Sequence, residues 1–235
     1  MKTTTLNSIK GILFIGISIY LAFTFNDALT NFVTKIPFIG WVKGSIILRI
    51  VISFSFARGL QLLFKSFSIR IKSIFVVSIG ALLGFTICFI AQPIYNTDYG
   101  TFGTTELSIQ LDDLKNETTT EFSLNKKPAL VVFFSTNCGS CKEMSIKIGE
   151  LQSMGNAPQI ITLFPGTEAD ALAFMNENGG QNFDYYMIDN DEFFMKTADY
   201  SFPSIFLVNG KGETIQHWNG ALMNYSAFDL IESYK

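Results

Sequence analysis

The first 95 residues of this 235-residue chain contain a single acidic side chain, Asp27, although the whole chain has 20 acids. The same region holds most of the apolar excess behind the mean hydropathy of +0.30. Its clearest stretch, residues 73–95, carries no charge and is long enough to cross the hydrocarbon core of a bilayer. Such a split is unlike a uniform globule, so we expect a membrane region, residues 1–95, followed by a soluble part.

Three apolar stretches predict an all-α membrane region of three spanning helices, at about residues 9–25, 45–64 and 73–95. The first stretch follows basic residues, a pattern that also describes a signal peptide. No small-x-small cleavage site follows it convincingly, so we expect an uncleaved span. Residues 26–44 contain proline and glycine, and we expect them to form a short loop.

Several residues within the predicted spans need an explanation. Arg49 and Arg58 are costly in a bilayer, and we expect them to snorkel to an interface or to pack between spans. A transport role is the alternative, but no acidic partner appears in the other spans. Gly80 and Gly84 have the spacing that allows two helices to approach closely. Cys88 lies alone in an apolar stretch, which favours a packing role over a redox role.

The distribution of basic residues predicts an orientation in the membrane. Positive charge favours the cytoplasmic side, and one side of the predicted spans carries more of it: Lys2, Lys10, Lys65, Arg70 and Lys72, against Lys35 and Lys43. We therefore expect a multi-pass cell-membrane protein with a cytoplasmic N-terminus and an exoplasmic C-terminal part. The net charge of −3 and the lack of a basic, aromatic-rich patch in the soluble half argue against a nucleic-acid partner.

Residues 96–103 read as a polar linker, and residues 104–235 alternate short elements of both kinds. Apolar and alternating runs predict strands at 106–111, 118–124, 129–135, 159–164, 204–208 and 213–218. Helical periodicity predicts helices at 142–154, 168–178, 191–198 and 225–234, with a turn or short helical piece at 111–114. This order predicts an α/β fold with a mixed sheet flanked by helices.

A Cys-Gly-Ser-Cys sequence, residues 138–141, stands between a predicted buried strand and a predicted helix. Unpaired N–H groups at a helix N-terminus favour the thiolate of Cys138, and the two-residue spacer lets Cys141 close a small disulfide ring. The alternative is half of a structural zinc site, which needs four ligands. The chain offers one histidine, His217, and one further cysteine in an apolar stretch, so we expect dithiol chemistry and no metal.

The strand, the cysteine pair, the Phe202-Pro203 strand start and the hairpin sequence at 209–213 together resemble the thioredoxin superfamily. The long segment between the cysteines and Pro203 is more similar to the membrane-tethered TlpA/ResA branch than to compact thioredoxins. The resemblance covers roughly residues 104–235 and does not extend to the membrane region. It implies a thioredoxin-like fold and thiol–disulfide oxidoreductase activity on protein thiols and disulfides.

The resemblance also implies roles for individual residues. Cys138 is expected to be the attacking nucleophile and Cys141 the resolving cysteine, with no cofactor besides this redox-active disulfide. Phe202 and Pro203, joined by a cis peptide bond, are expected to dock the substrate chain, assisted by Gly139 and Ser140 of the spacer. An ordinary proline at the start of a strand is the alternative for Pro203. The histidine is expected to be a packing or surface residue.

Two positions depart from the thioredoxin pattern. Asn137 stands where a tryptophan usually precedes the first cysteine, and Val132 stands where a buried acid is thought to help deprotonate the second. The proton acceptor for Cys141 is therefore unassigned. Lys142 and Glu143 could influence the thiolates, but their position favours solvated helix residues.

Three functions fit this sequence. The neutral Gly-Ser spacer favours a reductase of exported disulfides, which needs a separate electron donor because the spans lack a pair of cysteines. A disulfide oxidase or isomerase is the first alternative, and the measured reduction potential separates the two. A non-catalytic, membrane-tethered module that binds clients is the second alternative.

Overall fold

The structure is a computed structural model. It describes residues 2–36, 38–67, 71–91, 104–105, 107–109, 111–120, 124, 127–219 and 223–235. The chain divides into two compact units, Met1–Tyr95 and Asn96–Lys235, and each is described by itself. The predicted linker at 96–103, the predicted loop residue Pro37 and the basic residue Arg70 fall outside the described residues.

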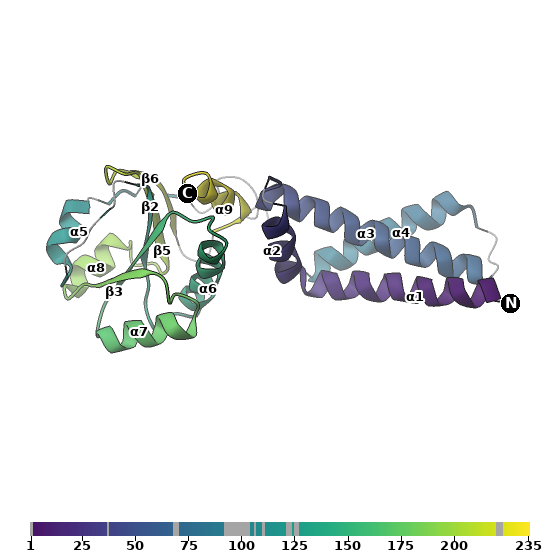
Figure 1. Ribbon diagram of the computed structural model, residues 1–235, viewed down its shortest axis with the longest axis horizontal. Helices are drawn as coiled ribbons and strands as arrows, with labels where there is room; N and C mark the ends of the chain where they lie inside the picture. Colours follow the sequence, from purple (N-terminus) through teal and green to yellow (C-terminus); the bar gives the residue numbers. More distant parts are fainter. Residues whose placement is uncertain are drawn as a thin grey trace. The chain divides into compact units, whose positions relative to one another are not determined.

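The N-terminal unit is helical, and the C-terminal unit mixes strands and helices (Figure 1). The helices of the first unit are α1 (Lys2–Phe23), α2 (Phe25–Lys35), α3 (Trp41–Ser66) and α4 (Ser73–Ala91). The elements of the second unit are β1 (Thr104–Thr105), α5 (Leu111–Glu117), β2 (Ala129–Phe133), α6 (Gly139–Ser153), β3 (Gln159–Phe164), α7 (Glu168–Glu177), β4 (Asp184–Met187), α8 (Asp191–Thr197), β5 (Ser204–Val208), β6 (Thr214–Asn219) and α9 (Tyr225–Glu232).

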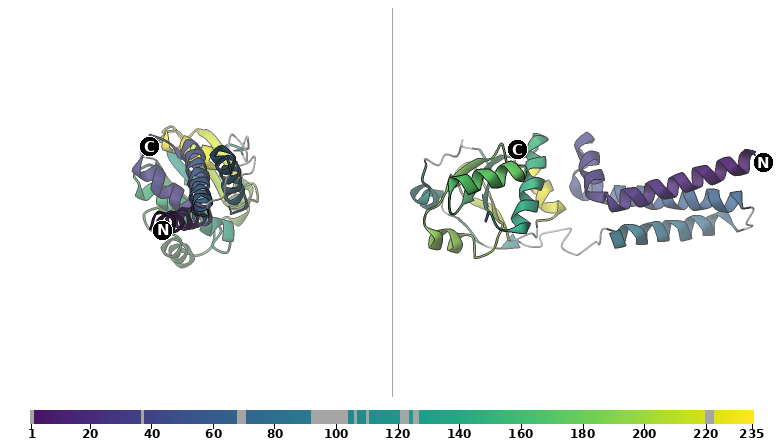
Figure 2. Two further views of the ribbon diagram at one scale, coloured as in Figure 1. Left: turned by 90° about the vertical axis from the view of Figure 1, so that its right-hand side faces the viewer. Right: turned by 90° about the horizontal axis from the view of Figure 1, so that it is seen from below.

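Helices α1, α3 and α4 lie side by side in the N-terminal unit (Figure 2). The segments Thr5–Phe23, Trp41–Ser66 and Ser73–Ala91 are long and apolar enough to cross a membrane. The prediction of three apolar helices ahead of an α/β domain is therefore confirmed. The middle helix, with 26 residues, is longer than the stretch predicted at 45–64.

The prediction of a loop at residues 26–44 is wrong over its first part, which forms the helix α2. Phe25, Leu29 and Val33 recur every four residues and are buried, so α2 packs one apolar stripe against its neighbours. Gly44 of α3 provides the space, because a Cβ atom there would lie 2.8 Å from a methyl group of Val33. Asp27 in the first turn complements the helix dipole.

Small residues mediate the contacts between the long helices. A Cβ atom at Gly80 would lie 2.7 Å from the Cα of Ala57, and one at Gly84 would lie 2.9 Å from the Cα of Ser53. These distances are shorter than ordinary van der Waals contact, so both glycines allow α3 and α4 to approach closely. The predicted role of this glycine pair in close helix contact is confirmed.

The two arginines of α3 have different surroundings. Arg49 is 3% exposed, and its guanidinium carbon lies 4.4 Å from the centre of the Phe25 ring, a cation–π contact between α3 and α2. Arg49 therefore packs between helices, one of the two explanations predicted for it. Arg58 is exposed and hydrogen bonds to Gln61. Cys88 is 1% exposed, as expected for a packing residue.

The C-terminal unit contains a mixed sheet with the strand order β1-β6-β5-β2-β3-β4. Strands β2, β3 and β4 are parallel, whereas β5 runs antiparallel to β2 and β6 antiparallel to β5. Helices α5 and α8 lie on one face of the sheet, and α6 and α9 lie on the other (Figure 1). The predicted α/β fold with a mixed sheet flanked by helices is confirmed.

The central strand β2 is apolar throughout because both faces of the sheet are covered. All five of its residues are fully buried. Phe133 contacts the rings of Phe194 on α8 and Phe206 on β5 at centroid distances of 5.4 and 5.8 Å. The ring of Phe134, directly after the strand, packs on the ring of Phe174 of α7 with centroids 5.3 Å apart. The cysteine pair therefore lies just beyond the carboxyl end of a fully buried central strand.

Two predicted strands are wrong, and the two edge strands, β1 and β4, were not predicted. The strands predicted at 106–111 and 118–124 are not present in the described parts of those segments, where Thr118 forms only an isolated bridge to Ile188. The seven-residue helix α5 places Leu114 in the core instead, in agreement with the short helical piece predicted there. The other predicted helices and strands are present, with bounds that differ by a few residues.

Candidate active site

The cysteine pair lies at the junction of β2 and α6. Cys138 is the N-cap of α6, and its sulfur accepts a hydrogen bond from the backbone N–H of Cys141 at 3.1 Å. The two Cα atoms are 5.2 Å apart, and the sulfurs form a disulfide. Cys138 is half-buried, whereas Cys141 is fully buried. A visiting molecule therefore reaches the Cys138 sulfur first.

The start of α6 stabilises negative charge on Cys138. The N-terminal N–H groups of a helix carry partial positive charge, and one of them already donates to this sulfur. Lys142 and Glu143 follow directly and are exposed, as predicted for solvated helix residues. Backbone dipoles, rather than a neighbouring side-chain charge, thus favour the thiolate.

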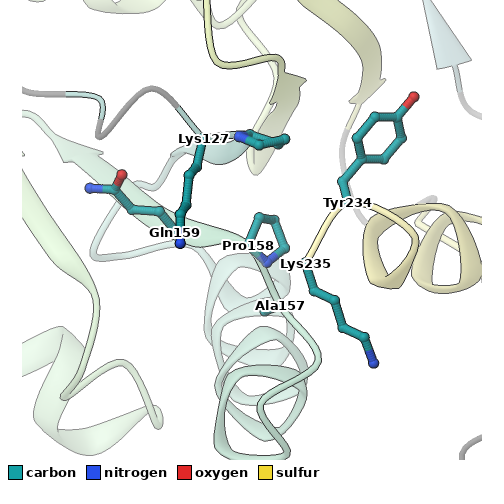
Figure 3. A pocket seen from close by; sticks show the side chains of 7 residues that line it. Lys127, Ala157, Pro158, Gln159, Tyr234 and Lys235 are labelled. Carbon is teal, nitrogen blue, oxygen red and sulfur yellow. The ribbon is translucent and has the colours of Figure 1, made fainter.

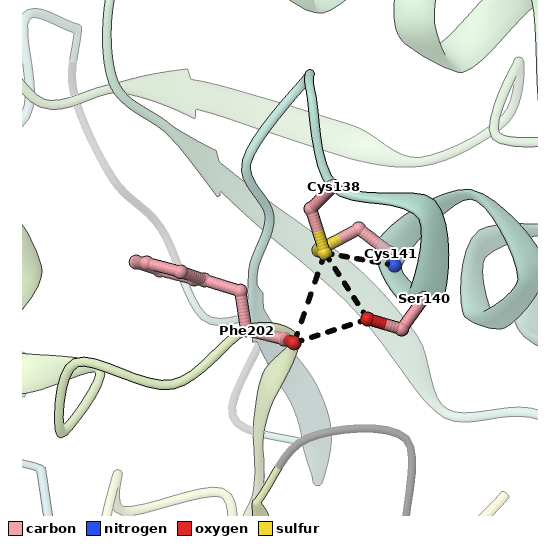
Figure 4. The surroundings of a disulfide bond; sticks show 4 residues. All are labelled: Cys138, Ser140, Cys141 and Phe202. Carbon is pink, nitrogen blue, oxygen red and sulfur yellow. Dashed lines mark hydrogen bonds between the residues drawn. A yellow bond between two sulfur atoms is a disulfide. The ribbon is translucent and has the colours of Figure 1, made fainter.

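The segment before β5 faces the cysteines. The Phe202–Pro203 peptide bond is cis, as predicted. The Phe202 carbonyl oxygen lies 3.7 Å from the sulfur of Cys138 and accepts a hydrogen bond from the hydroxyl of Ser140 at 3.3 Å (Figure 4). Ser140 Oγ is also 3.2 Å from the Cys138 sulfur. The fold therefore brings together residues separated by some sixty positions in the sequence.

The comparisons with known proteins decide the family. Residues 115–233, just over half of the chain, match the family model of the thioredoxin-like domain. The chain belongs to the thioredoxin-like family. None of the curated proteins compared with the chain matches it.

Several solved structures are similar to this thioredoxin-like chain. A secreted disulfide oxidoreductase of Mycobacterium tuberculosis, homologous to E. coli DsbE, is 16% identical, with 47% of this chain and 83% of that chain covered and a TM-score of 0.39. The thioredoxin domain of a thiol-disulfide oxidoreductase from Bacteroides vulgatus is 17% identical, with coverages of 57% and 99% and a TM-score of 0.40. StoA from Bacillus subtilis is 18% identical, with coverages of 50% and 92% and a TM-score of 0.38.

Thioredoxin-like domains with such a cysteine pair are thiol–disulfide oxidoreductases in type. The pair itself takes up and releases two electrons, so the reaction needs no bound cofactor. Within the part of the chain that the structure describes, no group of three or more His, Cys, Asp or Glu residues could hold a metal ion. His217, the single histidine, is bonded to a serine, and Cys88 belongs to the N-terminal unit.

The cis-proline segment of the thioredoxin-like domain is held by a ring contact on one side. The rings of Phe202 and Phe194 of α8 stack with centroids 5.4 Å apart and an interplanar angle of 16°. Phe194 is 1% exposed and belongs to the core. Helix α8 therefore anchors the residue whose carbonyl group faces Cys138.

A buried polar pair lies directly behind the same segment. Ser204, the residue after Pro203, hydrogen bonds to Nε2 of His217 at 2.7 Å, and both side chains are fully buried. The imidazole stacks on Phe206 with ring centres 4.1 Å apart. Burial lowers the pKa of His217 to about 4, against a smaller opposing effect of Asp199, so the ring is neutral at physiological pH.

The sequence predicts a packing or surface role for His217; the structure shows the packing alternative, and the hydrogen bond to Ser204 was not predicted. The signal was a serine immediately after the candidate cis-proline, in a strand that pairs with the strand of the only histidine. A single hydrogen bond across two strands leaves no pattern along one strand, so spacing alone could not reveal it.

Val132 lies at the position where the resemblance led us to look for a buried acid. Its side chain is fully buried, and the residues aligned with it on the neighbouring strands are Thr162 and Ile205. No carboxylate therefore stands beside it in the register of the sheet. Deprotonation of Cys141 does not use an acid at this position.

A pocket of about 380 Å³ lies away from the cysteines (Figure 3). It is lined by Lys127 and Pro128 before β2, by Gln159 at the start of β3, and by Tyr234 and Lys235 after α9. The cysteine pair follows the carboxyl end of β2, whereas this pocket lies at the amino ends of β2 and β3. The pocket is therefore not part of the dithiol site.

Proposed function

We propose that this protein is a membrane-anchored thiol–disulfide oxidoreductase that reduces disulfides of exported proteins. One observation carries the proposal: an accessible sulfur, Cys138, caps α6 beside the Phe202 carbonyl group, while its partner Cys141 is buried beneath it. This arrangement separates an attacking sulfur from a resolving one.

In the proposed reaction, the Cys138 thiolate attacks one sulfur of a client disulfide. A bond forms between Cys138 and that sulfur, the client S–S bond breaks, and the second client sulfur leaves as a thiolate. Cys141 then attacks Cys138, which releases the first client sulfur and closes the protein disulfide. The client gains two electrons and two protons, and the protein dithiol loses them.

The client chain docks at the cis-proline segment. The Phe202 carbonyl group can accept a hydrogen bond from the backbone of an extended client segment, and Pro203 fixes the direction of that carbonyl group. Gly139 and Ser140 form the opposite side of the docking position. A Cβ atom at Gly139 would meet no atom within 4 Å, so this side is open to a client.

The reducing direction rests on the spacer. Gly139 and Ser140 carry no charge that would stabilise the thiolate form strongly, so we expect a reduction potential nearer to the thioredoxin value of about −270 mV than to the DsbA value of about −120 mV. Equilibration of the full-length protein with glutathione buffers measures this potential. A value close to that of DsbA would contradict a reductase and indicate a disulfide oxidase instead.

The reductase must receive electrons from a separate partner. Cys88 is the single cysteine of the N-terminal unit, and carriers that move electrons across a membrane through thiols need two. Three helices long enough to span a bilayer support membrane anchoring. The distribution of lysine and arginine supports an exoplasmic C-terminal unit.

Trapping with a Cys141→Ser variant tests the function. Without the resolving sulfur, mixed disulfides through Cys138 should accumulate and can be separated on non-reducing gels and identified. The matched control is Cys138→Ser with Cys141 intact, which should trap no client because the remaining sulfur is buried. Equal trapping by both variants, or by neither, would contradict the proposal.

A further inference from the structure

The hydroxyl group of Ser140 lies between two acceptors. It is 3.3 Å from the Phe202 carbonyl oxygen and 3.2 Å from the Cys138 sulfur, and these two atoms are themselves 3.7 Å apart (Figure 4). A serine hydroxyl has one proton to donate. Ser140 can therefore satisfy only one of the two acceptors at a time, and the stronger acceptor receives the proton.

The redox state of the cysteines determines which acceptor is stronger. A sulfur in a disulfide is neutral and accepts hydrogen bonds weakly, so the hydroxyl donates to the Phe202 carbonyl oxygen. A thiolate is charged, and hydrogen bonds to charged groups are roughly twice as strong as those between neutral groups. Reduction of Cys138 therefore draws the same hydroxyl from the carbonyl oxygen to the sulfur.

We propose that Ser140 is a catalytic residue that couples client docking to the redox state of Cys138. Its hydroxyl covers the Phe202 carbonyl oxygen while the cysteines are joined, and turns to the Cys138 thiolate when they are reduced. The carbonyl oxygen then becomes available to a backbone N–H of an extended client segment. This inference rests on the proposed function, because it concerns the same docking position.

The coupling assists both the attack on the client disulfide and the release of the reduced client. In the reduced protein, Ser140 stabilises the attacking thiolate and leaves the docking acceptor open. Once the protein disulfide has formed, the hydroxyl returns to the Phe202 carbonyl oxygen and competes with the product for it. Ser140 donates a hydrogen bond in both states and transfers no proton, so the balance of the reaction is unchanged.

The test compares three dithiols as reductants of the oxidised full-length protein in detergent. The first is a short synthetic peptide with two cysteines, the second is the same peptide with N-methyl groups on the residues flanking each cysteine, and the third is dithiothreitol. The second lacks the backbone N–H donors, and the third has no backbone. The variants are Ser140→Ala, which removes the hydroxyl, and Ser140→Thr, which keeps it.

We expect Ser140→Ala to raise the second-order rate constant for the unmodified peptide about fivefold, the value of one competing hydrogen bond. The rates with the N-methylated peptide and with dithiothreitol should not rise, because neither reductant needs the carbonyl oxygen as an acceptor, and Ser140→Thr should behave like the wild type. In the reduced protein, Ser140→Ala should react more slowly with iodoacetamide at neutral pH, because the thiolate loses a donor. The two opposite effects of one substitution distinguish this role from a merely structural one.

Two results would overturn the inference while leaving the proposed function intact. One is an unchanged rate of Ser140→Ala with the unmodified peptide, and the other is an equal change with all three dithiols. Failure of the proposed function looks different. In that case the reduced wild-type protein does not reduce the disulfide form of the same peptide, although dithiothreitol does.

Discussion

At the scale of single residues, the candidate site depends on contacts made on both sides of Pro203. Phe202 stacks on Phe194, and Ser204 bonds to His217, so the residues before and after the proline are each held by the core. A buried hydroxyl left without its partner costs about 1–3 kcal/mol. Loss of the His217 ring would therefore leave the Ser204 hydroxyl, directly after Pro203, without this hydrogen bond.

His217 should make the C-terminal unit sensitive to mild acid. Its pKa is about 4 in the folded protein, against about 6.5 in an unfolded chain. Between these values the unfolded state binds the proton and the folded state does not, so stability falls as the pH drops from about 6.5 to about 4, by up to about 3 kcal/mol. Hydrogen exchange of the β5 and β6 amides as a function of pH measures this loss.

The chain has no other histidine, so the window between pH 5 and 6.5 reports on this residue. His217→Gln should be less stable at pH 7 and should lose the pH dependence within that window. A variant that keeps the wild-type pH dependence would show that another group is responsible.

The sequence predicts those residues whose role follows from a local sequence pattern. Cys138 and Cys141 form a motif with a strand before it, and Pro203 is followed by a strand and a hairpin signal, so both were found. The bond between Ser204 and His217 and the triangle around Ser140 were not found. The first joins the paired strands β5 and β6, and the second joins the start of α6 to the segment before β5, and sequence spacing does not encode such contacts.

At the scale of helices and strands, the missed elements are those whose patterns are weak. Strand β4 has an exposed Asp184 followed by two half-buried tyrosines, because it is the edge of the sheet, and it lacks the continuous apolar run of β2. Helix α2 is short and half polar, and it follows an apolar span directly. The sequence does not show that this apolar stripe packs against α3, because that contact depends on the space that Gly44 leaves.

Close contact between α3 and α4 should be sensitive to side-chain size at Gly84. A leucine there would meet the backbone of Ser53, so Gly84→Leu should destabilise the N-terminal unit by about 1–3 kcal/mol. Gly16→Leu is the matched control, since a Cβ atom at Gly16 meets nothing within 4 Å. Thermal unfolding of the full-length variants in the same detergent compares them. Equal losses for both variants would mean that the α3–α4 contact contributes little.

At the scale of the whole molecule, two independent patterns agree with each other. The uneven distribution of basic residues favours an exoplasmic C-terminal unit, and the proposed reductase needs client disulfides, which persist mainly outside the cytoplasm. The helices α1, α3 and α4 would then fix the dithiol to the oxidising side of the membrane, where exported proteins pass.

The measurement that tests this account most directly is labelling of Cys138 in sealed cells with a membrane-impermeant maleimide. In a Cys88→Ser, Cys141→Ser variant, Cys138 is the only thiol. After a membrane-impermeant phosphine has reduced any mixed disulfide of Cys138, we predict rapid labelling from outside, and none in a Cys138→Ser, Cys141→Ser control that retains the buried Cys88. Labelling of Cys138 only after the membrane has been opened would contradict the account.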